Sequence, residues 1–141
     1  MKMKIKLTET GNTPTKSDNG AAGYDLYADT DAIIYPGEVV KIPCGFSCEI
    51  PEGVVGLLFA RSGLGINKRI TPSNAVGVID SSFRGVVTAA LQNLSQDEFK
   101  ITRGDRVAQM VFVEYKSYDF EVVEELSETS RGIGGFGSSG K

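Results

Sequence analysis

The sequence predicts an all-β protein, built as a sandwich, a jelly roll or a closed barrel. Short runs of β-branched residues alternate with clusters of Gly, Pro, Asn and Asp, and the chain contains 17 glycines. No segment sustains an apolar period of 3.6 residues, so long helices are not expected. At 141 residues the chain is expected to form one domain whose core needs no disulfide or metal.

The first half of the chain is expected to contain six strands. Pro36-Gly37 and Pro51-Glu52-Gly53 have turn chemistry and divide the middle region into antiparallel pieces. Gly11–Gly23 is rich in Gly, Thr, Ser, Asn and Pro and is expected to be a surface connection. The six strands are predicted at Lys4–Thr8, Tyr24–Ala28, Ala32–Tyr35, Glu38–Pro43, Gly45–Ile50 and Val54–Ala60.

The second half is expected to contain five strands and one short helical turn, at Ser62–Lys68. A β-hairpin is predicted around Asn74–Arg84, because strand-forming residues flank the turn-formers Ser81 and Ser82. Asp80 would then lie where the first strand ends, either as a carboxylate that holds water beside a flat ligand or as the cap of an ordinary Asx turn. The five strands are predicted at Val76–Ile79, Val86–Leu91, Phe99–Ile101, Arg106–Val113 and Phe120–Glu124.

The tail from Ser127 onward is too rich in glycine to form a strand or helix of its own. It nevertheless contains an arginine, an aromatic residue and two hydroxyls spaced by glycines, which is typical of a segment that becomes ordered over a phosphorylated ligand. Two phosphate-loop patterns, Gly132–Gly137 (GxGxxG) and Gly135–Lys141 (GxxxxGK), are rejected. Both need a preceding strand and a following helix, and the tail predicts neither.

Composition excludes several classes of function. With a formal net charge of -3, no basic face is expected for a DNA or RNA polymer. No run approaches the length of a membrane span and the N-terminus has no apolar signal core, so a cytoplasmic protein without a membrane partner is expected. The chain has no histidine, which excludes Ser-His and Cys-His chemistry. Cys44 and Cys48 are too far apart on an extended segment to bridge and are expected to be free thiols.

Five short motifs follow one another along nearly the whole chain. Each alone is weak evidence, but together, in order and at family spacing, they resemble the five motifs of the homotrimeric dUTP diphosphatases (dUTPases). The motifs are Gly23–Ala28, Arg61–Gly65, Gly77–Gly85, Gly104–Met110 and Arg131–Gly140.

The resemblance implies a jelly-roll-like distorted β-barrel that forms a homotrimer with exchange of C-terminal arms. Residues 1–126 would form the barrel, and residues 127–141 the flexible arm that closes over the active site. The implied reaction is hydrolysis of dUTP to dUMP and pyrophosphate by attack of water on the α-phosphorus. Mg²⁺ would be held mainly by the substrate phosphates and water, which agrees with the absence of a carboxylate cage in the sequence.

The resemblance also implies a role for each motif residue. Asp80 would activate the attacking water, and Phe83, where the family usually has Tyr, would lie against the deoxyribose. The segment matching Asn74, Val78, Ile79 and Asp80 would pair with uracil through its backbone.

The phosphate-binding roles fall to residues from several motifs. Arg61, Ser62 and Gly63 would clamp the phosphates, and Gln109 would contact them near the scissile bond. Arg131 and the hydroxyls of the tail would bind the γ-phosphate while Phe136 stacks on uracil; the tail residues concerned are Phe136, Gly137, Ser138 and Ser139. Asp25 would support the site more than it touches substrate.

Besides Phe83, three positions depart from the family pattern: Ser82 replaces a common second acidic residue, Ser139 a common Thr, and Gly65 a common Ala. None removes a donor or base that the mechanism requires. The alternatives are a dCTP deaminase-like enzyme of the same fold, a nucleotide-controlled regulatory or interaction protein, and a jelly-roll binding module without catalysis. The absence of Glu from the segment around Asp80 argues against the deaminase.

Overall fold

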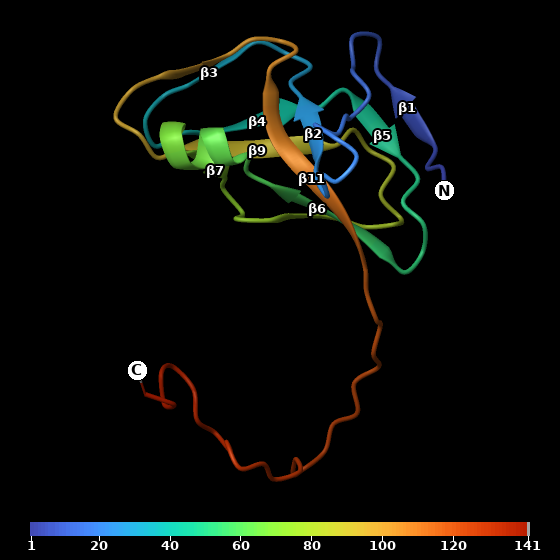
Figure 1. The fold of residues 1–141 in the computed structure, drawn as a ribbon, viewed down its shortest axis with the longest axis vertical. Coiled ribbons are helices and arrows are strands. Elements are labelled where there is room, and N and C mark those ends of the chain that lie inside the picture. Colours follow the sequence, from blue (N-terminus) through green and yellow to red (C-terminus); the bar gives the residue numbers. More distant parts are fainter. Residues whose placement is uncertain (141) are drawn as a thin grey trace.

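The structure is a computed structural model that describes residues 1–140, and it confirms the prediction of an all-β protein (Figure 1). Within these residues, eleven short strands wrap into a distorted barrel with one helical turn, η1. The elements are β1 (Ile5–Leu7), β2 (Tyr24–Tyr27), β3 (Ala32–Ile34), β4 (Val39–Pro43), β5 (Phe46–Cys48), β6 (Val54–Phe59), η1 (Gly63–Lys68), β7 (Ile70–Pro72), β8 (Gly77–Ile79), β9 (Thr88–Asn93), β10 (Phe99–Ile101) and β11 (Arg106–Glu114).

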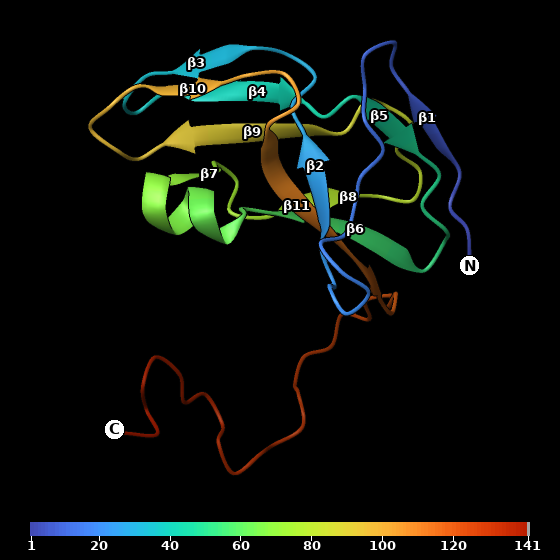
Figure 2. The same cartoon turned by 45° about the horizontal axis from the view of Figure 1, so that its top comes forward.

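The strands form four sheets in which all pairs are antiparallel. The largest has the order β2-β11-β6-β8, and the next has the order β4-β9-β7 (Figure 2). Two small sheets, β1-β5 and β10-β3, complete the barrel. In the largest sheet β8 is an edge strand, so one side of its backbone has no strand partner among residues 1–140.

The core follows from the alternation of side chains along the strands. Leu26, Leu58 and Met110 point inward from three neighbouring strands of the largest sheet, and Ile42 and Leu91 point inward from the facing sheet. All five side chains are buried, and each fully buried Leu or Ile contributes about 1.5–3 kcal/mol to folding. The core therefore packs the β4-β9-β7 sheet against the largest sheet, whose strands carry or adjoin four of the five motifs.

The prediction of a hairpin around Asn74–Arg84 is wrong. Ser81 and Ser82 do form a turn, and the amide of Phe83 donates to the carbonyl of Asp80 at 3.1 Å. However, β8 pairs with β6, whereas the strand after the turn begins at Thr88 and pairs with β4 and β7. Val87 instead bonds through its backbone to Cys44 and Phe46, because its buried side chain belongs to the other layer of the core.

Two further differences concern strands. The predicted strand Phe120–Glu124 is absent from the structure of residues 1–140, because these residues have no backbone partner and stay exposed. Conversely, β7 was not predicted, since three residues ending in Pro72 give almost no alternation to detect. It forms because β9 offers a backbone edge to it.

The turn and helix predictions are confirmed. Gly37 and Gly53 have φ of 81° and 79°, which favours glycine at both predicted turns. The predicted helical turn is a six-residue π-helix, and it ends at Arg69 in a left-handed conformation with φ of 58°. No helix within residues 1–140 is long and apolar enough to cross a membrane.

Both thiols are free, as expected, and the structure shows that both are buried. Burial raises the pKa of the Cys44 thiol to about 12 and also raises that of Cys48. Both cysteines therefore stay protonated at neutral pH and act as small apolar core residues.

One carboxylate ties the N-terminal segment to the end of β2. The hydroxyls of Thr10 and Thr8 donate to the two oxygens of Asp29, each at 2.6 Å. These hydrogen bonds, that of Thr10 first, hold the pKa of Asp29 below its ordinary value of 3.8. Because the folded-state pKa is depressed, the stabilisation is present above pH 3.8 and is lost as the pH falls through the folded-state value.

We therefore expect Asp29→Asn to lower the urea midpoint of unfolding at pH 7, with a difference from the parent that shrinks as the pH falls below 3.8. The measurement is a series of urea denaturation curves between pH 7 and pH 3. Asp119→Asn, in the exposed segment after β11, is the control and should leave the midpoint unchanged. A difference between parent and Asp29→Asn that is constant with pH would contradict this account.

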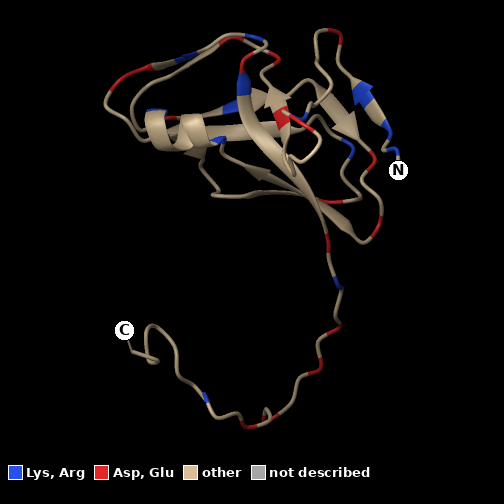
Figure 3. Cartoon of the chain, in the orientation of Figure 1, with Lys and Arg blue, Asp and Glu red and all other residues tan. Residues whose placement is uncertain are grey.

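The chain after β11 leaves the barrel. Residues 115–140 form no strand or helix, and Figures 1 and 2 show them running away from the sheets. Tyr118, Phe120, Val122 and Leu126 are all exposed along the first part of this segment. Figure 3 shows acidic residues (red) recurring along the same part of the chain.

Candidate functional site

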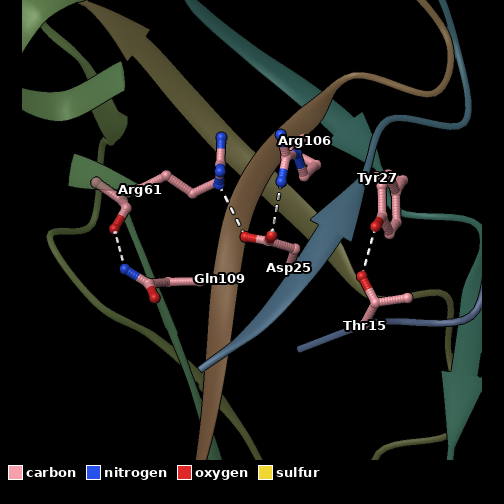
Figure 4. Close-up of polar contacts among 7 residues, drawn as sticks. Thr15, Asp25, Tyr27, Arg61, Arg106 and Gln109 are labelled. Atoms are coloured by element: carbon pink, nitrogen blue, oxygen red, sulfur yellow. Dashed lines mark hydrogen bonds and ion pairs between the residues drawn. The ribbon is translucent and has the colours of Figure 1, made fainter. Parts of the chain in front are cut away.

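Asp25 is the centre of a polar cluster on the outer face of the largest sheet (Figure 4). Its Oδ1 accepts from Arg61 Nε at 2.8 Å, and its Oδ2 accepts from Arg106 Nη1 at 3.4 Å. The side chain is 14% exposed, so this carboxylate is largely removed from water and depends on its two cationic partners. The predicted supporting aspartate therefore joins three motifs, on β2, after β6 and on β11.

The segment Arg61–Gly63 connects the end of β6 to the π-helix. Arg61 is held by Asp25 through Nε, which leaves its two terminal nitrogens without an acceptor among residues 1–140. Ser62 is exposed at the N-cap of the π-helix, and its hydroxyl makes no capping hydrogen bond. Gly63 is exposed, and a Cβ built on it would meet nothing within 4 Å. A guanidinium, a hydroxyl and an open backbone thus lie together, as an anion site requires.

Gln109 lies on β11 directly opposite Asp25 on β2 and opposite Phe59 on β6. Its Nε2 donates to the carbonyl of Ala60 at 2.9 Å, so the side chain fixes the residue that precedes Arg61 (Figure 4). A Cβ built on Gly23 would lie 2.5 Å from Gln109 Oε1, so glycine is what lets this amide fit. One N–H of the Gln109 amide remains for another acceptor.

Asp80 and its neighbours form a second group. Asp80 is exposed immediately after β8, as predicted. Val78 is 60% exposed, Ile79 is half-buried, and Asn74 is exposed in the turn before the strand. Phe83 is 42% exposed, and its ring lies over Gly85, where a Cβ would come 2.6 Å from Cζ.

The turn after Asp80 is fixed by backbone and side-chain bonds. Arg84 Nη1 donates to the carbonyls of Ser81 and Phe83 at 2.6 and 2.9 Å. The Arg84 guanidinium therefore stabilises the turn that precedes it.

The two groups lie at opposite ends of the same strand pair. Gly56 pairs with Ile79 and Leu58 with Gly77, so Asp80 follows the end of β8 that lies beside the start of β6. Arg61 follows the other end of β6. Six residues of extended chain separate the position opposite Asp80 from Arg61, which is about 20 Å. One chain therefore does not bring the predicted base and the predicted phosphate clamp together.

The tail residues lie apart from both groups. Arg131 Nε donates to the carbonyl of Gly134 at 2.8 Å, within the tail itself. Phe136 is fully exposed and has a left-handed φ of 49°. Gly137, Ser138 and Ser139 follow it on the surface.

Neither the cavities nor the carboxylates of the described residues form one enclosed site that contains all the predicted residues. Of three cavities of about 460, 400 and 380 Å³, only the second is lined by a predicted substrate-binding residue, Arg61. The largest is mostly apolar and lies between the N-terminal segment and β2 and β11. Among residues 1–140, no three Asp, Glu or Cys side chains gather as metal ligands.

Sequence reasoning missed two contributors to the first group. Arg106 lies inside the fourth motif but was given no role, although the motif's acidic and basic neighbours were a usable signal. Gly23 was assigned only to its motif, and its function of making room for Gln109 depends on contacts between β2 and β11 that spacing does not reveal.

The fold and the two groups define a class of distorted β-barrel that carries separate polar groups on its surface. The chain superposes on dUTPase of Staphylococcus bacteriophage 80alpha bound to dUPNHPP with a TM-score of 0.93, 27% sequence identity and 99% coverage of both chains. The G164S mutant of the same phage enzyme gives a TM-score of 0.92 at 26% identity, with 99% of each chain covered.

Sequence comparison gives the same family. A family model for dUTPase matches residues 9–140. Deoxyuridine 5'-triphosphate nucleotidohydrolase of Desulfitobacterium hafniense is 45% identical over 96% of this chain and 92% of its own, and that of Corynebacterium glutamicum is 42% identical over 97% and 93%. The relative from avian adenovirus 8 is 41% identical over 91% of this chain and 77% of its own. The chain belongs to the dUTPase family.

Proposed function

We propose that this protein hydrolyses dUTP to dUMP and pyrophosphate, and that Asp80 is the general base. The observation that carries the proposal is the exposed carboxylate of Asp80 at the end of an edge strand, three residues before the exposed ring of Phe83. The dUTPase family to which the chain belongs is the context for that observation. A positioned carboxylate suits a hydrolase, because simple binding of an anionic nucleotide gains nothing from it.

The proposed reaction is in-line attack of water on the α-phosphorus. Asp80 takes a proton as the water oxygen bonds to the phosphorus, and the bond between the α-phosphorus and the bridging oxygen breaks. The electron pair leaves with pyrophosphate.

The edge position of β8 supports recognition of uracil by the backbone. Because β8 has a strand partner on one side only, the N–H and C=O groups on its other side can pair with a planar ligand. Val78, Ile79 and the preceding Asn74 would present this edge. Cytosine has an acceptor at N3 and a donor at C4, where uracil has a donor and an acceptor, and would leave backbone groups of the site unpaired.

We propose that the Phe83 ring lies against the deoxyribose and so excludes ribose. We also propose that Gly85, which has no side chain, leaves the space that the ring occupies. We expect Gly85→Ala to displace the ring, because a Cβ would lie 2.6 Å from its Cζ. The ratio of kcat/KM for dUTP to that for UTP should fall roughly tenfold.

The measurement is steady-state hydrolysis of both nucleotides by Gly85→Ala. Phe83→Tyr is the matched control, since it keeps the ring and should keep the ratio. Unchanged discrimination in Gly85→Ala would show that the Phe83 ring does not select the sugar.

The triphosphate is proposed to bind Arg61, Ser62, the Gly63 amide and the free N–H of Gln109. Arg131, Ser138 and Ser139 would add contacts to the γ-phosphate when the tail, residues 127–141, closes over the 1–126 barrel. Phe136 would then stack on uracil, with Gly137 allowing the close approach. The exposure of all these tail residues supports a segment available to do this.

Magnesium is proposed as the cofactor, and the donor set fits an ion that arrives with the nucleotide. Mg²⁺ commonly keeps several waters and binds substrate phosphates instead of a dedicated protein cage. With no three-carboxylate cluster among residues 1–140, the triphosphate oxygens and water would hold it. Bound there, the ion supplies neutralisation of phosphate charge.

A homotrimer is proposed because the two groups of one chain cannot meet. The strand pairing places Asp80 and Arg61 about 20 Å apart, so the base of one subunit would complete the phosphate clamp of another. Exposed apolar residues after β11, such as Phe120 and Val122, support an arm that docks on a neighbouring copy. The free buried thiols agree with the proposed cytoplasmic location.

The experiment that tests the function is pyrophosphate release from dUTP, dTTP, dCTP and UTP with Mg²⁺. Turnover of dUTP alone is expected. Ammonia release from dCTP would identify a deaminase instead, and binding of dUTP without turnover would leave a nucleotide-controlled binding protein.

A further inference from the structure

We propose that Arg106 is a positioning residue for the phosphate clamp: it shares the carboxylate of Asp25 with Arg61, so that the clamp keeps a net positive charge. This inference rests on the proposed function. It assigns a role to a side chain that need not touch the nucleotide, and it explains why the backbone of β11 departs from regular pairing at this point.

A β-bulge aims Arg106 at Asp25. On β11, Gln109 pairs with Asp25 and Ala108 with Leu26, but Arg106 rather than Val107 lies opposite Tyr27. The bulge buries two successive residues, Val107 and Ala108, and returns Arg106 to the outer face of the sheet. In a regular strand Arg106 would point to the inner face, away from the carboxylate.

The charges of the cluster explain what this arrangement achieves. Asp25 and Arg61 alone would form a neutral pair, and the carboxylate would offset much of the attraction between Arg61 and a triphosphate. Arg106 adds a second positive charge, so the three side chains together carry one net positive charge. Each oxygen of Asp25 has its own arginine, which lets Arg61 bond through Nε and keep both terminal nitrogens for phosphate oxygens.

Both arginines of the cluster lie at the same surface cavity. Arg61 and Arg106 line the same cavity of about 400 Å³, together with Gly104 and the acidic residue Asp105. Arg106 is 52% exposed and Arg61 is 29% exposed, so neither charge is sealed in the core. The cluster is therefore open on the side from which an anion would arrive.

The first test is the binding of dUPNHPP, the nucleotide analogue bound to the phage 80alpha enzyme, to Arg106→Gln in the presence of Mg²⁺. The neutral side chain of nearly the same size should weaken binding of the analogue roughly tenfold, through loss of one charge near the phosphates. Binding of dUMP should weaken much less, because it has one phosphate group. Arg106→Lys keeps the charge and should stay within about threefold of the parent.

Lys100→Gln is the matched control. It removes the same charge from an exposed side chain on β10, and within residues 1–140 the one ion pair of Lys100 is a 3.6 Å contact with Glu98. It should bind the analogue as the parent does. The unfolding temperature of Arg106→Gln should stay within a few degrees of the parent, because Arg61 still pairs with Asp25 at 2.8 Å and the lost contact is a longer one, at 3.4 Å, from a half-exposed side chain.

A double variant separates positioning from direct phosphate contact. In Asp25→Asn/Arg106→Gln the cluster again carries one net positive charge, from Arg61 alone, and the side-chain carbonyl of the new amide can still accept from Nε. Affinity for the analogue should therefore recover to within about threefold of the parent.

Three outcomes would overturn the inference while leaving the function intact. These are unchanged analogue binding in Arg106→Gln, equal weakening of dUMP and analogue binding, and no recovery in the double variant. Each would be seen beside a parent protein that hydrolyses dUTP. A parent that neither binds nor hydrolyses dUTP would instead overturn the proposed function itself.

Discussion

Replacing Asp80 with Asn is expected to lower kcat for dUTP about a thousandfold, or ~4 kcal/mol of transition-state stabilisation. The amide cannot accept the proton of the attacking water, whereas the exposed position of Asp80 means that the fold is unaffected. Affinity for dUTP should change little, because the carboxylate acts mainly in the transition state. Steady-state pyrophosphate release and analogue binding give the two quantities.

Glu52→Gln is the control for this variant. It removes a carboxylate from an exposed turn at the opposite end of β6 from Arg61, and it should leave kcat unchanged. If Asp80→Asn kept more than a tenth of the parent rate, Asp80 would not be the base. If it lost binding and rate equally, Asp80 would be a binding residue.

Removing residues 131–141 is expected to lower kcat/KM for dUTP by two to three orders of magnitude. The truncation deletes Arg131, Phe136 and the two hydroxyls proposed to close over the nucleotide, and with them the exclusion of water from the site. The barrel should fold normally, since no residue between 131 and 140 belongs to the buried core. The unfolding temperature and the circular dichroism spectrum check this point.

Two single variants separate the contribution of the tail to phosphate binding from its contribution to base stacking. Arg131→Ala should lose the contact with the γ-phosphate and weaken the analogue more than dUMP, whereas Phe136→Ala should weaken both, because stacking acts on the base. A truncated chain that hydrolyses dUTP at the parent rate would remove the tail from the mechanism.

The local elements of the fold were predictable because their signals are local. Glycines at positive φ mark the turns at Gly37 and Gly53, and the alternation of apolar side chains marks strands such as β6 and β11. The exposed end of β8 at Asp80 was also predictable, because the turn chemistry of Ser81 and Ser82 depends on neighbouring residues.

Pairing of the strands was not predictable in the same way. The turn after Asp80 was expected to close a hairpin, but β8 pairs with β6, and Val87 bonds to Cys44 and Phe46. Turn chemistry determines where the chain reverses, whereas long-range burial determines which edge it then meets. For the same reason the expected strand Phe120–Glu124 has no partner within residues 1–140.

By itself the sequence determined the all-β class, the resemblance to the dUTPase family and the candidate residues, because motifs and alternation are properties of neighbours along the chain. Only the tertiary structure decided that Asp25 holds both Arg61 and Arg106, that a bulge places Arg106 there, and that Asp80 lies far from the clamp of its own chain. These relations depend on register between strands distant in sequence, and register is fixed by the packing of the whole core.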